Sequence, residues 1–103
     1  MNKRLNTTFA GRPMINPFVL ASAPPSATPA MLERAFEAGW GGAVVKTLIE
    51  EPVNNLCNRF GSSRVGRSVV GFQNVELASE VSVGDWLEGA RKLKARFPDR
   101  MLI

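Results

Sequence analysis

Short apolar runs alternate with amphipathic stretches along this sequence. Residues 18–22 and 43–47 are mostly apolar runs bounded by turn residues, which is typical of short strands buried on both faces. Between them, residues 29–37 repeat apolar positions with the period of a helix. A strand, a helix and a second strand in this order predict a βαβ unit, and therefore a parallel pair of strands.

The first helix has clear start and stop signals. Thr28 and Pro29 are a typical N-cap and first helical residue, and Gly39 is a natural residue to end the helix. We expect Trp40 to pack beneath that end. The apolar stripe consists of Met31, Leu32, Ala35 and Phe36.

A second helix follows near the end of the sequence. Ser82 is its predicted cap, with Asp85 three residues on as a variant of the capping box, and Pro98 stops it. Residues 101–103 then begin another apolar run, which predicts a further strand. The apolar stripe of this helix consists of Val83, Trp86, Leu87, Ala90, Leu93 and Phe97.

The remaining segments predict a hairpin and two loops. Residues 7–10 and 13–15 flank Gly11 and Arg12, which we expect to form the turn of a short hairpin. Residues 23–27 contain consecutive prolines that cannot continue a central strand, so they predict a loop. Residues 48–72 show little periodicity and predict a long loop, either a mobile lid facing a ligand or a disordered surface loop.

Together these elements predict an α/β fold. The order is a hairpin, a strand, a helix, a strand, a loop, a helix and the first residues of a further strand. Such an open-ended series, ending as a strand begins, indicates part of a larger parallel fold. Two helices cover only a small sheet, so we expect a core that is marginal against chain entropy.

Charge and composition restrict the classes of partner. The net charge of +4, from 13 Lys and Arg against 9 Asp and Glu, raises nucleic acid as a partner. Arg59, Arg64 and Arg67 are however scattered, with only Phe60 nearby and no interleaved aromatic residues. The other basic residues fall mostly on the solvated side of the second helix. We therefore expect no nucleic-acid partner, with a small basic nucleic-acid-binding protein as the competing hypothesis.

Other function classes are excluded by what the sequence lacks. It has no run approaching the roughly 20 apolar residues that a membrane-spanning helix needs, and no apolar segment behind its basic start, so we expect no membrane partner and no secretion. It has no histidine, so imidazole chemistry is absent and no metal site is expected. Cys57 is the single cysteine, which excludes an internal disulfide and fits a reducing cytoplasm.

Lys46 is the first candidate for chemistry. It lies where the apolar run 43–47 ends, and ligand sites of parallel α/β folds collect at the carboxyl ends of their strands. A cation at this position would face whatever the fold binds. The alternative is an ordinary surface lysine just past a strand.

Three segments carry a resemblance to a known family. They are residues 16–23 (NPFVLASA), 35–47 (AFEAGWGGAVVKT) and 71–76 (GFQNVE). Their order and spacing resemble the FMN-binding barrel of dihydropyrimidine dehydrogenases, most closely the bacterial NAD-dependent type, and more broadly the dihydroorotate dehydrogenase family. The resemblance covers nearly the whole sequence, and implies that residues 1–103 are the N-terminal part of a (β/α)8 TIM barrel preceded by a short β-hairpin.

The resemblance implies a flavin site. Ala21 and Ser22 match the end of the first barrel strand, whose backbone and hydroxyl contact the flavin. Lys46 and Thr47 match the end of the second strand, where the lysine reaches the pyrimidine part of the flavin ring. From the sequence alone, Ser22 could instead be a strand-end hydroxyl bonded to backbone.

The resemblance also implies substrate contacts. Asn74 matches an asparagine that hydrogen-bonds the pyrimidine, and Glu76 matches an acidic residue that helps hold the substrate loop. An amide suits uracil because it offers a donor and an acceptor together. The alternatives are that Asn74 is a turn residue and that Glu76 is a carboxylate in the first turn of a helix.

The family's activity is an expectation for the complete enzyme. Enzymes of this family reduce the 5,6 double bond of uracil or thymine with electrons from NAD(P)H. These electrons pass to FMN through FAD and iron–sulfur clusters, some of which lie in a partner subunit. The resemblance further implies an oligomer when full length, and a catalytic cysteine that lies beyond Ile103, which leaves Cys57 as a passive thiol. Asn58 and Arg59 replace the Pro-Arg that the family often has. Dihydroorotate oxidation and a catalytically inactive fragment are the alternatives.

Overall fold

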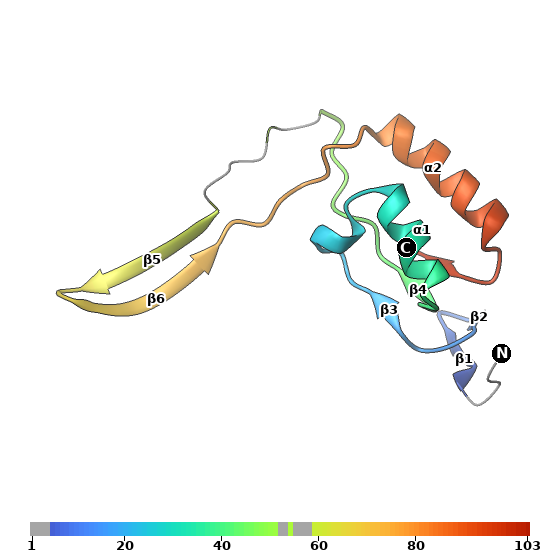
Figure 1. Cartoon of the computed structure of the whole chain (residues 1–103), viewed down its shortest axis with the longest axis horizontal. Helices are drawn as coiled ribbons and strands as arrows, with labels where there is room; N and C mark the ends of the chain where they lie inside the picture. The colour runs from blue at the N-terminus through green and yellow to red at the C-terminus, as the bar shows by residue number, and fades with distance from the viewer. Residues whose placement is uncertain (1–4, 52–53, 55–58) are drawn as a thin grey trace.

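A computed structural model describes residues 5–51, 54 and 59–103 of the chain. Figure 1 shows a body of short strands and helices with a long hairpin extending from it. The order of elements is β1 (Thr7–Phe9), β2 (Arg12–Met14), β3 (Val19–Leu20), the 3-10 helix η2 (Pro24–Ser26), α1 (Pro29–Glu37), β4 (Gly42–Ala43), β5 (Phe60–Val65), β6 (Ser68–Asn74), α2 (Val83–Arg96) and β7 (Met101–Leu102).

The centre of the body is a parallel sheet in the order β3-β4-β7. The regular strands are shorter than the apolar runs that predicted them, but the ladder continues past β4. Val44 N donates to Leu20 O and Val45 N donates to Ile103 O, both at 2.8 Å. The predicted βαβ unit and the strand at 101–103 are therefore confirmed.

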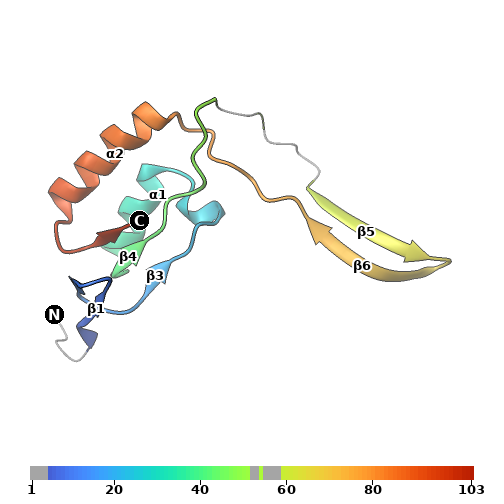
Figure 2. The ribbon, with the colours of Figure 1, turned by 180° about the vertical axis from the view of Figure 1, so that it is seen from behind.

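Both helices contribute to one core with the middle strand. The buried cluster joins side chains from α1, β4 and α2, and partly buried Leu20, Val45 and Trp40 pack around it. Figures 1 and 2 show the two helices side by side. On their exposed rim, Arg96 of α2 pairs with Glu33 and Glu37 of α1. The cluster consists of Leu32, Phe36, Ala43, Trp86 and Leu93.

The helix ends agree with their sequence signals, whereas the apolar stripes are narrower than predicted. The Thr28 and Ser82 side chains cap α1 and α2, and Gly39 has φ +103° just after α1. Met31 and Leu87, members of the predicted apolar stripes, are 41% and 66% exposed, so the stripes are buried only in part. The periodicity predicts which face of a helix is apolar, but the small sheet covers only the centre of that face.

The hairpin near the N-terminus is confirmed, with its turn one residue earlier than predicted. Phe9 pairs with Arg12, so Arg12 begins β2 and does not lie in the turn. Ala10 and Gly11 form the turn with φ of +48° and +74°. Two consecutive positive φ values fit a turn of type I′, whose twist suits a two-residue hairpin.

The prediction of a long loop over residues 48–72 was wrong for its second part. Residues 60–74 form the antiparallel β5–β6 hairpin, which turns at Gly66 with φ +58°. Phe60 and Phe72 stack on it with ring centroids 5.8 Å apart. A register shift after Ser63 interrupts the alternation of the strands, which explains the weak sequence pattern.

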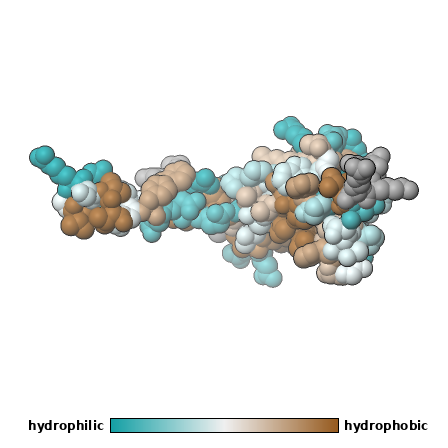
Figure 3. Space-filling view, turned by 90° about the horizontal axis from the view of Figure 1, so that it is seen from below, coloured by the Kyte–Doolittle hydropathy of each residue, from teal (hydrophilic) through white to brown (hydrophobic). Residues whose placement is uncertain are grey.

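The β5–β6 hairpin lies apart from the body (Figures 1 and 2). Val65, Val69 and Val70 near its tip are more than half exposed, and Figure 3 shows this apolar surface at the far end of the molecule. None of the described helices is long and apolar enough to cross a membrane. The described fold is thus a mixed α/β body carrying one extended hairpin.

Candidate functional site

Lys46 lies at the carboxyl end of the central strand and is buried. Its side chain is 2% exposed, and its backbone N donates to Ser26 O at 3.2 Å. The interpretation of Lys46 as an ordinary surface lysine is therefore wrong. A buried ammonium needs a partner, because leaving a charge unpaired away from water is costly.

Glu76 is that partner. Lys46 Nζ donates to Glu76 Oε1, although the Glu76 side chain is 62% exposed. The hydrogen bond from Lys46, followed by the charge of Lys46, lowers the pKa of Glu76 below its ordinary value of 4.5, and Arg59 adds a smaller effect in the same direction. Since α2 begins at Val83, Glu76 is not a carboxylate in the first turn of a helix.

The segment that carries Glu76 is hydrogen-bonded to the end of the central strand. Ser79 N donates to Thr47 O at 2.8 Å, and the Ser79 hydroxyl accepts a hydrogen bond from Trp86 Nε1 at 2.8 Å. Ser79 is 1% exposed. The sequence interpretation missed Ser79, because nothing in the sequence distinguishes it from a solvated serine ahead of the Ser82 cap.

Ser26 is a second residue that the sequence interpretation missed. It is fully buried, and its hydroxyl accepts from Ala23 N at 3.0 Å and lies 3.1 Å from Ala21 O. These contacts close the turn after β3, and Ser26 O accepts the Lys46 amide. The serine that follows two prolines was the available signal, since such residues often close tight turns.

The remaining predicted flavin residues share one edge of the sheet. Ala21 and Ser22 follow β3, while Lys46 and Thr47 follow β4, and the two strands are parallel neighbours. Ala21, Ser22 and Thr47 are exposed, so the hydroxyl-bearing residues Ser22 and Thr47 lie at the solvent-facing end of these strands.

Asn74 lies on the hairpin. It ends β6, is exposed, and is paired through its backbone with Phe60, so it is not a turn residue. Asn74 precedes Glu76 by two residues, and the Lys46–Glu76 contact therefore brings this end of the hairpin to the edge of the sheet. Cys57 and Asn58 lie outside the described residues.

The cavity beside Lys46 is small. It has a volume of about 190 Å³, below the roughly 300–1,000 Å³ that ligand pockets occupy. The cavity formed by the described residues at this edge is therefore too small to enclose a flavin-sized ligand. The cavity is lined by Pro24, Ala27, Thr28, Lys46, Leu77, Ala78, Glu80 and Val81.

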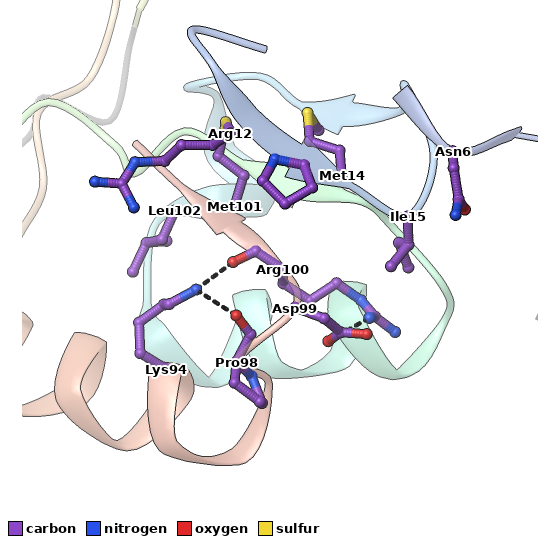
Figure 4. A pocket seen from close by; sticks show the side chains of 11 residues that line it. Asn6, Arg12, Met14, Ile15, Lys94, Pro98, Asp99, Arg100, Met101 and Leu102 are labelled. Carbon is purple, nitrogen blue, oxygen red and sulfur yellow. Dashed lines mark hydrogen bonds and ion pairs between the residues drawn. The ribbon is translucent and has the colours of Figure 1, made fainter. Parts of the chain in front are cut away.

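A larger open cavity of about 560 Å³ lies at the amino end of β7, opposite Lys46 (Figure 4). Three of its charged groups, those of Lys94, Asp99 and Arg100, make local contacts. Lys94 Nζ donates to the carbonyl oxygens of Pro98 and Arg100 at 3.1 and 2.5 Å, and Arg100 pairs with Asp99. This cavity lies away from the carboxyl ends of the strands, where parallel folds bind their ligands.

Among residues 5–51, 54 and 59–103, no group of three His, Cys, Asp or Glu side chains could hold a metal ion. The chemically useful groups of the described edge are therefore an ammonium, its carboxylate partner and exposed hydroxyls. Such a set can stabilise negative charge and donate hydrogen bonds to an acceptor-rich ring.

Comparison with known proteins identifies relatives over the whole sequence. The chain is 37% identical over 107 residues to a chloroplastic dihydropyrimidine dehydrogenase (NADP(+)) of Arabidopsis thaliana, covering 96% of this chain and 25% of that protein. It is 35% identical over 104 residues to the NAD-dependent dihydropyrimidine dehydrogenase subunit PreA of Escherichia coli K12, covering 100% of this chain and 25% of the subunit. No protein-family model matches the sequence. The chain thus spans about a quarter of the length of these relatives, and its resemblance to dihydropyrimidine dehydrogenases is confirmed.

Proposed function

We propose that this chain is part of an FMN-dependent dihydropyrimidine dehydrogenase, in which residues 1–103 supply the first strands of a (β/α)8 barrel. The order of β3, α1, β4, α2 and β7, with parallel neighbours, supports this proposal. Such a barrel carries its reaction site at the carboxyl ends of the strands. Lys46 and Ser22 lie at that edge.

The observation that carries the proposal is the buried Lys46 ammonium at the end of the central strand, held by Glu76. A lysine in this position is costly to bury for stability alone. Its placement is explained if the cation acts on a ligand at the same edge. The exposed carboxylate of Glu76 pairs with the ammonium and orients it at this edge.

The residues at this edge suit the polar rim of a flavin. The ring presents acceptor atoms on its pyrimidine part, and the edge offers the Lys46 ammonium with the hydroxyls of Ser22 and Thr47 and the backbone of Ala21 as donors or acceptors. When bound, FMN supplies hydride transfer. Lys46 would hold a fixed positive charge beside the part of the ring where negative charge develops, and thereby stabilise it.

The pyrimidine base would meet the hairpin end of the same site. Asn74 offers an amide donor and acceptor that match a carbonyl and N–H edge, and Glu76 keeps the adjoining segment at the sheet. The reaction proposed for the complete enzyme is reduction of the 5,6 double bond of uracil or thymine. Its electrons would come from NAD(P)H through iron–sulfur clusters and an FAD-binding partner subunit, in a cytoplasmic oligomer.

The isolated chain should bind FMN weakly and show no turnover, since it forms only one wall of the site around a cavity of about 190 Å³. Recovery of a yellow chain with tightly bound flavin after purification would overturn this part of the proposal.

The proposal is tested by tagging the chain in its own cells and purifying the assembly that contains it. We expect the assembly to contain FMN and to oxidise NAD(P)H when uracil or thymine is added. Lys46→Gln should reduce flavin content and turnover. Lys92→Gln, which changes an exposed lysine on α2, should leave both unchanged. An assembly without flavin, or equal losses in the two variants, would contradict the proposal.

A further inference from the structure

A buried pair of side chains connects α2 to the segment that carries Glu76. The indole N–H of Trp86 donates to the Ser79 hydroxyl at 2.8 Å, and the two residues are 2% and 1% exposed. The same hydroxyl accepts from Val81 N at 3.1 Å. Ser79 is therefore fixed in position by two donors, one of them on a core side chain.

Ser79 is also hydrogen-bonded to the strand end that carries Lys46. Its backbone N donates to the carbonyl oxygen of Thr47, the residue after Lys46, at 2.8 Å. Glu76 lies three residues before Ser79, within reach of the lysine. The hydrogen bond between Ser79 and Thr47 thus places the Glu76 carboxylate opposite the Lys46 ammonium.

The Lys46–Glu76 ion pair alone holds the two segments together only weakly. Glu76 is 62% exposed, and ion pairs with a solvated partner contribute little to holding two segments together. Buried hydrogen bonds are more effective, because a buried polar group that loses its partner has no water to replace it. The Trp86–Ser79 contact is buried, so it is the stronger constraint on where Glu76 lies.

We propose that Ser79, held by the Trp86 indole, is a positioning residue that sets Glu76 against Lys46 and so fixes the ammonium at the sheet edge. That the fixed ammonium would act on a flavin rests on the proposed function. The part that concerns the Lys46–Glu76 contact rests on the contacts above alone.

The test follows the carboxyl carbon of Glu76 by NMR during an acid titration of the full chain. The groups that act on this carboxylate are Lys46 and Arg59, and Glu80 lines the cavity beside Lys46. In the unmodified chain the pKa of Glu76 should lie below 4.5. Ser79→Ala keeps the backbone bond to Thr47 but removes the hydroxyl contacts with Trp86 and Val81, so it should move the Glu76 pKa up toward that ordinary value as the carboxylate rests less closely against the ammonium.

Three further variants separate positioning from general stability. Trp86→Phe keeps an aromatic ring in the core but removes the donor, so it should raise the Glu76 pKa as Ser79→Ala does. Ser79→Thr keeps the hydroxyl and should retain the low value. Leu93→Ala weakens the core at the other end of α2 and should leave the titration of Glu76 unchanged.

No flavin is present in this titration, so its result is independent of the proposed function. An unchanged Glu76 titration in folded Ser79→Ala or Trp86→Phe would overturn the positioning role. A shift in Leu93→Ala equal to that in Ser79→Ala would also overturn it, since general loosening would then explain both.

Discussion

The buried ammonium of Lys46 and the exposed carboxylate of Glu76 meet across 30 residues of chain. One partner is held by the central parallel strand, and the other lies between the β5–β6 hairpin and α2. Their contact joins the hairpin end to the edge of the sheet. The contact therefore places groups from both halves of the proposed ligand site next to each other, and the first two predictions below depend on it.

Acid should weaken the chain through Glu76. Its pKa is lowered in the folded state, so the stabilisation is complete above the ordinary value of 4.5 and is lost as the pH falls through the lower folded value. Protonated Glu76 leaves the buried Lys46 without its counter-charge. Urea midpoints measured from about pH 6 to about pH 3 should fall more steeply for the unmodified chain than for Lys46→Met. Parallel curves for the two proteins would show that the pair contributes nothing.

Substitution of the two partners should have unequal effects on stability. Lys46→Met removes a buried charge and leaves Glu76 solvated, so the free energy of unfolding should stay the same or rise by about 1 kcal/mol. Glu76→Gln leaves the buried ammonium without its counter-charge and should lower the urea midpoint. A greater loss of stability in Lys46→Met than in Glu76→Gln would contradict the described burial.

Two glycines of α2 form a matched pair that tests the packing of the helices. A Cβ at Gly89 would lie 2.4 Å from Pro29 Cγ in α1, so Gly89→Ala should destabilise the chain by roughly 1–3 kcal/mol. A Cβ at Gly84 meets nothing within 4 Å, so Gly84→Ala should stabilise it by about 0.4–1 kcal/mol. Chemical unfolding of both variants measures the difference. Similar changes of the same sign would show that α1 and α2 do not pack as described.

Removal of the hairpin should leave the body intact. None of the residues from 60 to 74 belongs to the buried core cluster, so replacing them by a short Gly-Ser linker should not change the melting temperature. Fluorescence of Trp40 and Trp86, which both lie in the body, reports its unfolding separately from the hairpin. A clear fall in the melting temperature of the body would mean that the hairpin supports the core.

The sequence predicted the elements whose signals are local. Thr28 with Pro29 and Ser82 with Asp85 are adjacent cap signals, and both helices begin there. The β5–β6 hairpin was missed because its glycines and its register shift interrupt the alternation. The exposure of Leu87 was also missed, since periodicity reports a helix face and not how much of it other layers cover.

The candidate site was predictable only in part. The position of Lys46 after an apolar run indicated the edge of the sheet where it lies. Its partner could not be deduced from spacing, because Glu76 follows a hairpin that the sequence did not reveal. Ser79 carries no local signal at all, as its role arises from the tertiary contact with Trp86.

The midpoint potential of the flavin in the purified assembly tests the central claim most directly. If the Lys46 ammonium faces the flavin, Lys46→Gln should lower that potential by some tens of millivolts, given about 30 mV for each tenfold change in a two-electron equilibrium. Loss of a fixed cation disfavours the negative charge of the reduced ring. Lys92→Gln should leave the potential unchanged. Equal potentials in the Lys46→Gln and Lys92→Gln assemblies would contradict the account.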